Sequence, residues 1–321
     1  KSKVYAEQMR INFDEKDDSY TLALGGMTYG VNLVQLAGSY TTFANNGYFK
    51  SPKFISFITD KNNKLIYINK TPSKKVLRED SSYLITDMLK TCAKTGTARK
   101  LSTLNMEIAS KTGTVGKSNS KENLDAWNIS YTKNQTIGIW LGNLDNSIIN
   151  YTGGNQPTEI VRNYFQVVQD DSQFDKPNSI IEKRIDGIDL VENHKITLAN
   201  GLTPERYTQT ELFSNFNLPT DISNKFAQVE KIKVQGRVEN GNAVIEFDAK
   251  DYETYIIKVG NKKIEEISGK NGKQTTIIPL SASKQTITIE NFYSLSPDNK
   301  ISQELSFVKR NKDTINDKWY I

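Results

Sequence analysis

The tetrapeptide Lys-Thr-Gly-Thr occurs twice in this sequence, at residues 94–97 and at residues 111–114. The first copy lies at the end of a predicted helix over residues 80–92. The second copy lies within a predicted strand over residues 106–115, where alternate side chains point to opposite faces of a sheet. The second copy is therefore the candidate for chemistry.

The residue types in the second copy suit recognition of an acyl substrate at a strand edge. Lys111 supplies a positive charge that can hold a carboxylate, and the hydroxyls of Thr112 and Thr114 can bind the same carboxylate. Gly113 lets a substrate approach the backbone closely, because it has no Cβ atom. The backbone N–H of Thr114 can donate to an oxyanion that develops during acyl transfer. We therefore predict that Lys111 and Thr114 are catalytic. Thr112, Gly113 and Thr114 are predicted to bind substrate.

The residue counts exclude several other kinds of site. The chain has one cysteine, Cys92, and one histidine, His194, which rules out a disulfide framework and a Cys/His zinc site. A histidine base beside a nucleophile is nearly excluded too, so acid–base work falls to Lys, Asp, Glu or Tyr. Cys92 is expected to be a buried small hydrophobe, and His194 a solvated surface residue.

Charge and hydropathy limit the partners. The net charge of +5 is mild, and the basic residues are not clustered with aromatic ones, so nucleic acid is a poor candidate. No apolar run is long enough to span a membrane.

The surrounding pattern predicts helices and an antiparallel sheet in the first half of the chain. Asn32 is the expected N-cap of a helix whose apolar residues recur every three or four positions, and the segment Asn45-Asn46-Gly47 supplies its left-handed stop. Further elements are helices over residues 2–11 and 80–92 and from Pro157, a hairpin over residues 53–59 and 64–69, and a three-strand meander over residues 106–115, 124–132 and 135–142.

The second half of the chain has a different pattern. Its first part has little periodicity, and about seven short strands follow at roughly ten-residue spacing, which predicts an all-β sandwich of immunoglobulin or fibronectin type III kind. The chain is thus expected to contain an α+β region over residues 1–175, a linker or extension over residues 176–225 and a β-sandwich over residues 226–321.

The second Lys-Thr-Gly-Thr copy resembles the K-T-G motif of penicillin-binding proteins and serine β-lactamases. Neighbouring segments extend the resemblance to about residues 1–220: residues 24–47, 94–98, 125–132, 136–143 and 211–219. Residues 94–98 resemble a Gly-Thr turn between helices in that family, so the first copy is expected to be a structural turn. The Gly-Gly-Met sequence that begins at Gly25 and the Asp-Ala-Trp sequence that begins at Asp125 are similar to class A rather than class B penicillin-binding proteins. We therefore expect residues 1–175 to be the C-terminal portion of a penicillin-binding transpeptidase domain.

The resemblance implies a fold and a reaction. The fold is that of serine β-lactamases, with a five-stranded sheet between helical layers, of which this chain holds a part. The reaction is D,D-transpeptidation: a serine attacks the D-Ala-D-Ala amide of a peptidoglycan stem peptide, forms an acyl-enzyme and passes the acyl group to an amine on a neighbouring stem. β-Lactams would acylate the same serine. No metal or organic cofactor is implied.

The nucleophile of that family is not in its expected place. In the family, S-x-x-K and S-x-N precede the Gly-Gly-Met segment, but the residues before Gly25 contain neither. A formal S-x-x-K runs from Ser118 to Lys121 in a polar loop, where little desolvates a lysine and lowers its pKa. The chain also starts at Lys1 without a signal peptide pattern. We expect the nucleophilic serine and its lysine, a glycosyltransferase domain and a membrane anchor upstream, in an extracytoplasmic protein. This chain alone is then inactive, and the upstream half is its first partner.

Two other functions stay open on the sequence. One is a catalytically dead module that binds peptidoglycan or a protein partner, which an upstream S-x-x-K would argue against. The other is a surface adhesin, which leaves the context of the K-T-G motif unexplained. Within the strands, Asp125 and Trp127 are expected to pack rather than to contact substrate, and Ser110 to be an ordinary strand residue.

Overall fold

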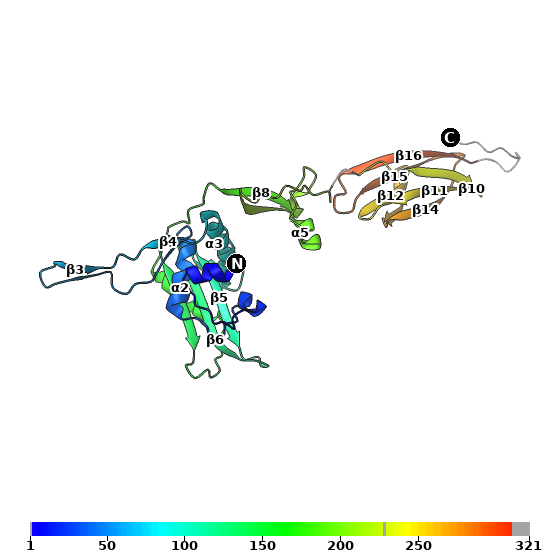
Figure 1. The fold of residues 1–321 in the computed structure, drawn as a ribbon. Coiled ribbons are helices and arrows are strands. Elements are labelled where there is room, and N and C mark those ends of the chain that lie inside the picture. Colours follow the sequence, from blue (N-terminus) through cyan, green and yellow to red (C-terminus); the bar gives the residue numbers. More distant parts are fainter. Residues whose placement is uncertain (1, 227–228, 310–321) are drawn as a thin grey trace. The chain divides into compact units, whose positions relative to one another are not determined.

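The computed structural model describes residues 2–226 and 229–309, and the chain divides into two compact units (Figure 1). The N-terminal unit comprises the residues up to Ile181 together with Leu212–Leu218. The C-terminal unit comprises Glu182–Glu211 and the residues from Pro219 onward. Among the described residues, no helix combines the length and the apolar character needed to cross a membrane.

The sheet of the N-terminal unit is the predicted three-strand meander. Strands β5 (Ala109–Gly116), β6 (Asn123–Tyr131) and β7 (Thr136–Gly142) are antiparallel and lie in the order β5-β6-β7. Within the described part of the chain, β5 pairs with a strand on one side only. Its outer edge therefore presents backbone groups that can pair with an extended ligand.

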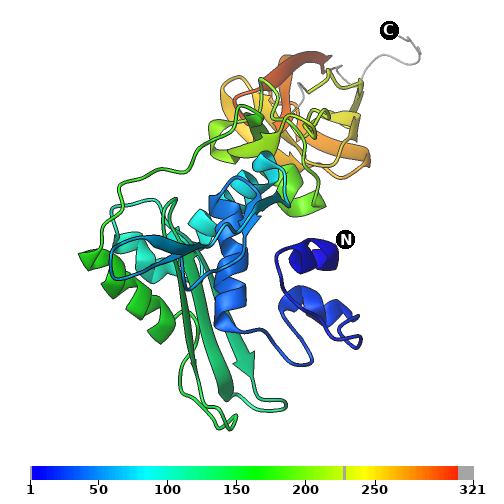
Figure 2. The ribbon, with the colours of Figure 1, turned by 60° about the vertical axis from the view of Figure 1, so that its left-hand side comes forward.

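Helices cover both faces of this sheet. A Cβ built on Gly138 would lie 2.8 Å from the side chain of Leu33, which places α2 (Leu33–Ala44) on one face. The next side chain on β7, Ile139, points to the opposite face and packs with the apolar cluster of α4 (Gln156–Val167). Figure 2 shows the sheet between α2, in blue, and α4, in green.

The first long helix, α2, begins and ends as predicted. The side chain of Asn32 accepts a hydrogen bond from the N–H of Gln35 at 2.8 Å, which satisfies one of the unpaired donors at the start of α2. Gly47 adopts φ +86°, a left-handed conformation that glycine tolerates.

Other elements of this unit are α3 (Glu79–Lys94), α1 (Ser2–Gln8), the 3-10 turns η1 (Tyr20–Leu24) and η2 (Arg99–Thr103), and the paired strands β1 (Tyr48–Lys50) and β4 (Ser73–Lys75).

The hairpin predicted between residues 53 and 69 is a separate ribbon that extends from the N-terminal unit (Figure 1). Its strands β2 (Phe57–Thr59) and β3 (Leu65–Ile68) pair antiparallel, and every residue in them is exposed. A two-stranded ribbon of this kind forms no core of its own.

The segment predicted as a linker contains regular structure. Strands β8 (Ile180–Asp186) and β9 (Thr208–Ser214) pair with each other, and α5 (Gly187–Asn193) and η3 (Glu205–Tyr207) lie between them in the sequence. The carboxylate of Asp186 caps α5 by accepting the N–H of Ile188 at 2.8 Å. This polar segment has little hydrophobic periodicity, which is why the sequence did not reveal these elements.

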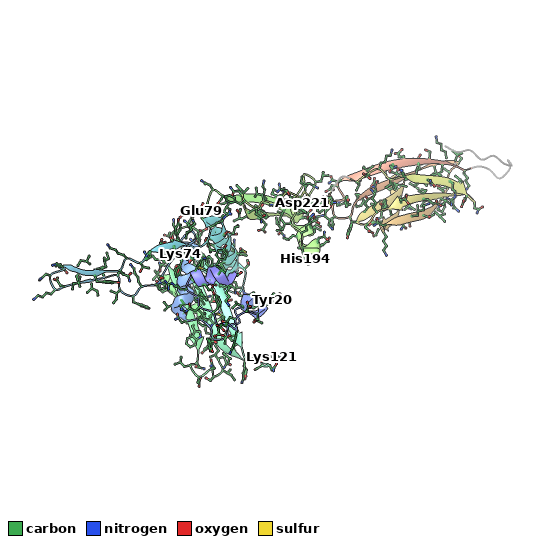
Figure 3. All side chains as sticks on the ribbon, in the orientation of Figure 1. Tyr20, Lys74, Glu79, Lys121, His194 and Asp221 are labelled. Carbon is green, nitrogen blue, oxygen red and sulfur yellow. The ribbon has the colours of Figure 1, made fainter. Side chains whose placement is uncertain are left out.

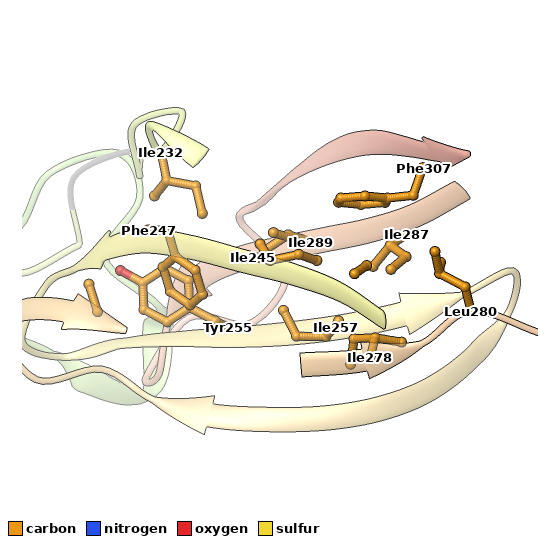
Figure 4. Close-up of a cluster of buried hydrophobic side chains, with 12 residues drawn as sticks. Ile232, Ile245, Phe247, Tyr255, Ile257, Ile278, Leu280, Ile287, Ile289 and Phe307 are labelled. Atoms are coloured by element: carbon orange, nitrogen blue, oxygen red, sulfur yellow. The ribbon is translucent and has the colours of Figure 1, made fainter. Parts of the chain in front are cut away.

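All seven strands expected near the C-terminus are present, in two antiparallel sheets. The strands are β10 (Val234–Glu239), β11 (Asn242–Ala249), β12 (Glu253–Val259), β13 (Lys262–Ser268), β14 (Gly272–Pro279), β15 (Lys284–Tyr293) and β16 (Lys300–Val308). One sheet has the order β10-β11-β14 and the other has the order β13-β12-β15-β16. Buried side chains from both sheets form one apolar cluster, in which Ile245, Ile257, Ile287 and Ile289 are fully buried (Figure 4).

Candidate functional site

The predicted site residues lie on the edge strand β5, where the strand passes from the interior to the surface. Ala109 and Ser110 are fully buried, and Lys111 is exposed. The ammonium group of Lys111 donates a hydrogen bond to the carbonyl oxygen of Thr112 at 2.8 Å. This contact keeps the positive charge beside the backbone of the strand, where an anionic ligand could meet it.

Gly113 lies opposite Trp127 in the ladder between β5 and β6. A Cβ atom built on Gly113 would lie 3.2 Å from the Cβ of Trp127, so a larger residue would press against that side chain. The indole of Trp127 lies 6.1 Å from that of Trp140, between ring centroids, and the indole N–H of Trp140 donates to Asp125 at 2.7 Å. These contacts agree with the prediction that Asp125 and Trp127 pack within the sheet.

The hydroxyl of Thr114 is held by the turn that precedes α4. The backbone N–H of Gly153 donates to the Oγ1 atom of Thr114 at 3.0 Å. A Cβ on Gly153 would lie 2.4 Å from the carbonyl oxygen of Trp127 and 2.5 Å from that of Gly113. The turn therefore packs directly on the backbone of β5 and β6, and only glycine fits at this position.

A group of buried polar side chains lies on β5, β6 and α4 beside this turn. Ser110, Asn128, Ser130 and Thr158 have no exposed surface. The amide nitrogen of Asn128 donates to Ser110 at 3.1 Å and to Thr158 at 2.9 Å, and Ser130 donates to the amide oxygen of Asn128 at 2.6 Å. Ser110 was predicted to be an ordinary strand residue, but its hydroxyl is part of this hydrogen-bond network.

The first Lys-Thr-Gly-Thr copy forms a turn at the C-terminal end of α3, as predicted. It also contacts the second copy, because the hydroxyls of Thr97 and Thr112 lie 2.7 Å apart. A Cβ on Gly154 would lie 2.6 Å from the carbonyl oxygen of Thr97, so the turn before α4 packs against the first copy as well. The two copies, which begin 17 residues apart in the sequence, thus meet at one end of β5.

The S-x-x-K sequence at Ser118 lies in the exposed turn between β5 and β6, not at the start of a helix. Lys121 is labelled in Figure 3 on that turn. The turn is closed by its own contacts, such as the hydrogen bond from the N–H of Lys117 to the carbonyl of Glu122 at 2.8 Å. Nothing in this setting desolvates a lysine or activates a serine.

Four other titratable residues lie outside the second Lys-Thr-Gly-Thr copy. Burial raises the pKa of Tyr40 to about 12, and burial also raises the pKa of Tyr131, so neither phenol is a base near neutral pH. His194 has φ +51° and ends α5. Cys92 is half-buried and lies 3.5 Å from the hydroxyl of Thr97. In the described part of the chain, no three His, Cys, Asp or Glu residues are placed to hold a metal ion.

The sequence did not reveal a buried carboxylate at the start of α3. Asp80 is only 2% exposed, forms an ion pair with Arg78, and accepts a hydrogen bond from Ser214 at 2.5 Å. These hydrogen bonds, chiefly the one from Arg78, lower the pKa of Asp80 to about 2. Phe216 stacks under the guanidinium of Arg78, with 4.0 Å between the guanidinium carbon and the ring centroid. This cluster attaches residues 212–218 to the rest of the N-terminal unit.

The sheet, its edge strand and the Lys-Thr-Gly-Thr segment define a domain of the penicillin-binding transpeptidase class. The family model for the penicillin binding protein transpeptidase domain matches residues 8–166. The chain belongs to this family, and its relatives place it with the class A penicillin-binding proteins, which confirms the family predicted from its motifs.

Two relatives from Bacillus subtilis illustrate the similarity. Penicillin-binding protein 1A/1B is 26% identical over 322 residues, which is 92% of this chain and 34% of that protein. Penicillin-binding protein 1F is 34% identical over 173 residues, which is 53% of this chain and 24% of that protein. The chain thus spans about a third or less of the length of these relatives.

A solved structure supports the fold assignment. The crystal structure of penicillin-binding protein 1A from Haemophilus influenzae matches 68% of this chain and 37% of that chain, with a TM-score of 0.53 and 21% sequence identity. At this identity the likeness concerns the fold alone. It supports the transpeptidase-like arrangement of sheet and helices in this chain.

Proposed function

We propose that this chain is the K-T-G-bearing part of a D,D-transpeptidase that cross-links peptidoglycan through a serine acyl-enzyme. The observation that carries the proposal is the edge strand β5. It presents the Lys111 ammonium, the hydroxyls of Thr112 and Thr114 and the backbone of Gly113 at the border of the sheet. Membership of the transpeptidase family supports the same reaction.

The geometry supports a division of roles within the strand. A D-Ala-D-Ala stem peptide would extend along the outer edge of β5, as a strand adds to a sheet. Its terminal carboxylate would meet the hydroxyls of Thr112 and Thr114 and the charge of Lys111. The N–H of Thr114 would donate to the oxyanion that forms when the scissile carbonyl is attacked.

The chemical step needs a serine that we place upstream of this chain. The serine Oγ forms a bond to the carbonyl carbon of the penultimate D-Ala, and the terminal D-Ala leaves as its amine after it accepts a proton. An amine of a neighbouring stem then attacks the acyl-enzyme and releases the serine. Ser118 is a poor candidate for this role because it lies in an exposed turn outside any helix. We therefore propose that the chain by itself is inactive and that its upstream half is its first partner.

The proposed function also implies where the protein is located. Peptidoglycan stem peptides and β-lactams are met outside the cytoplasm. We place the chain there, joined to the membrane by an upstream anchor.

The seven strands of the C-terminal unit support a further structural proposal, a sandwich of the fibronectin type III kind. The first, second and fifth strands form one sheet, and the fourth, third, sixth and seventh form the other, as in Greek-key sandwiches of that kind. Both sheets contribute to one core. We propose residues 226–321 as this domain, with residues 1–175 as the transpeptidase portion and residues 176–225 as an extension between them.

Labelling with a fluorescent penicillin, followed by mass mapping of the modified residue, tests the function. We expect no labelling of this chain alone and labelling at a serine before Lys1 in the protein extended by its upstream coding sequence. Labelling of this chain at Ser118 would show that our placement of the nucleophile is wrong. Failure of the extended protein to label would instead favour a catalytically dead module that binds peptidoglycan.

A further inference from the structure

One branch of the buried network beside β5 runs from Asn128 through Thr158 to Gly153. Asn128 uses both hydrogens of its amide nitrogen, to Ser110 and to Thr158. Because the Thr158 oxygen accepts from Asn128, its own hydrogen is available to the carbonyl oxygen of Gly153, 2.6 Å away. The carbonyl group of Gly153 is thus held by a side chain of the buried network.

The same turn fixes the direction of the Thr114 hydroxyl. The N–H of Gly153 can only donate, so the Thr114 oxygen must accept at their 3.0 Å contact. One lone pair of that oxygen is then occupied by a donor from behind the strand. The hydroxyl hydrogen of Thr114 therefore remains to be donated elsewhere, and Thr114 is exposed on β5.

We propose that Asn128 and Thr158 are positioning residues for carboxylate recognition. Through Gly153 they hold the Thr114 hydroxyl as a hydrogen-bond donor toward the terminal carboxylate of an incoming stem peptide or β-lactam. This inference rests on the proposed transpeptidase function and adds two side chains that touch neither substrate nor nucleophile. It also explains why fully buried hydroxyls and an amide lie behind an edge strand, where apolar side chains would stabilise the sheet at less cost.

The close packing of Gly153 makes the arrangement rigid. A Cβ at that position would overlap backbone atoms of both Trp127 and Gly113, so the turn lies directly against the strand. The direction of the Thr114 hydroxyl then depends on the carbonyl partner that Thr158 provides. Removing the Thr158 hydroxyl leaves that carbonyl unpaired in a buried site, so Gly153 loses one of the contacts that fix its N–H relative to Thr114.

The test compares two ligands of one protein, the full-length protein that includes the upstream half. The second-order rate constant of acylation is measured with a penicillin that carries its free carboxylate and with the methyl ester of the same penicillin. We expect Thr158→Val to lower the ratio of the two rate constants about tenfold, because a hydrogen bond to a charged group is lost and the ester makes none of equal strength. Thr158→Ser keeps the hydroxyl and should restore the ratio.

Two further variants separate positioning from stability. Thr86→Val is the matched control, because Thr86 is 1% exposed and its hydroxyl lies 3.0 Å from that of Tyr131, outside the network. It should lower the melting temperature and leave the ratio within about twofold of the original. Thr158→Cys keeps most of the side-chain volume and a weak donor, and it should give an intermediate ratio if Thr158→Val does not fold.

The outcomes distinguish this inference from the function on which it rests. If the ratio stays unchanged in Thr158→Val, the positioning role is overturned. Thr158→Cys takes the place of Thr158→Val where the latter does not fold. Acylation of the original protein still upholds the transpeptidase function in that case. An equal fall of the ratio in Thr86→Val also overturns the positioning role, since any loss of stability would then suffice. No acylation of the original protein by the free acid would overturn both proposals together.

Discussion

Behind β5, the N-terminal unit buries the hydroxyls of Ser110, Ser130 and Thr158 and the amide of Asn128, whereas the C-terminal unit fills the space between its sheets with aliphatic and aromatic side chains. Apolar burial is roughly additive and has no direction, so it supplies stability. Buried hydrogen bonds stabilise less but fix the orientation of each group. The groups behind β5 are thus oriented by hydrogen bonds, whereas the cluster between the two C-terminal sheets is held by apolar contacts.

The two units also differ in how much of their β-structure packs on a core. In the N-terminal unit, β5 has an unpaired edge within the described chain, and the β2–β3 ribbon exposes large apolar side chains such as Phe57, at 62%, and Ile66, at 66%. In the C-terminal unit, one cluster takes buried residues from both sheets. We therefore expect the C-terminal unit to gain more of its stability from its own core.

The largest effect on stability should come from the core of the C-terminal unit. Ile257 on β12 is fully buried among side chains of both sheets. Ile257→Ala should lower the free energy of unfolding of this unit by about 2–5 kcal/mol, because it removes buried methyl groups and leaves a cavity. Hydrogen exchange of the β12 amides, followed by mass spectrometry, measures the change.

The control for this prediction is an isoleucine of the same unit. Ile277 on β14 is 61% exposed, so Ile277→Ala should change the unfolding free energy by less than about 0.5 kcal/mol. Equal effects of the two substitutions would contradict the view that one continuous core stabilises this unit.

A smaller, pH-dependent effect is expected in the N-terminal unit. The pKa of Asp80 is lowered to about 2 by Arg78 and Ser214. A carboxylate with a lowered pKa contributes stability above its unfolded pKa of about 4, and that contribution disappears as the pH falls from about 4 to about 2. Asp80→Asn should therefore cost about 2 kcal/mol at pH 7 and almost nothing at pH 2.

Denaturant unfolding at pH 7 and at low pH measures this difference. The fluorescence of Trp127 and Trp140 reports on the N-terminal unit, in a background where Trp319 is replaced by phenylalanine. A cost for Asp80→Asn that is the same at both pH values would show that the carboxylate acts through packing rather than through its charge.

The sequence predicted the elements that carry local signals. The β-branched and aromatic runs of β5, β6 and β7 are bounded by turns, and the Asn32 cap and Gly47 stop mark α2, so each was recognised from a short window. The seven strands near the C-terminus were found in the same way. In contrast, β8 and β9 lie in a polar segment, where hydrogen bonding rather than periodicity determines the structure.

The buried hydrogen bonds around the site could not be predicted, because the residues that form them are distant in the sequence. Thr158 is 30 residues from Asn128, and Ser214 is 134 residues from Asp80. One signal was present: Asn128 and Ser130 are polar at alternate positions of β6, which indicates a polar stripe on one face of that strand. The stripe alone does not say whether it faces water or a buried network, since α4 covers it only in the folded unit.

The central claim is that the outer edge of β5 is part of the active site of an acylated enzyme, and that Lys111 on this strand is needed for acylation. The direct measurement is the second-order rate constant of acylation by benzylpenicillin for the protein that includes the upstream half, with Lys111→Ala and with Lys117→Ala. Lys117 follows β5 directly, is exposed and forms an ion pair with Glu122, so it is a nearby control of equal charge outside the strand. We predict that Lys111→Ala lowers the rate constant at least about 100-fold, as loss of one stabilising group in an active site does, and that Lys117→Ala changes it by less than about twofold. Equal rate constants for Lys111→Ala and the original protein would contradict the account.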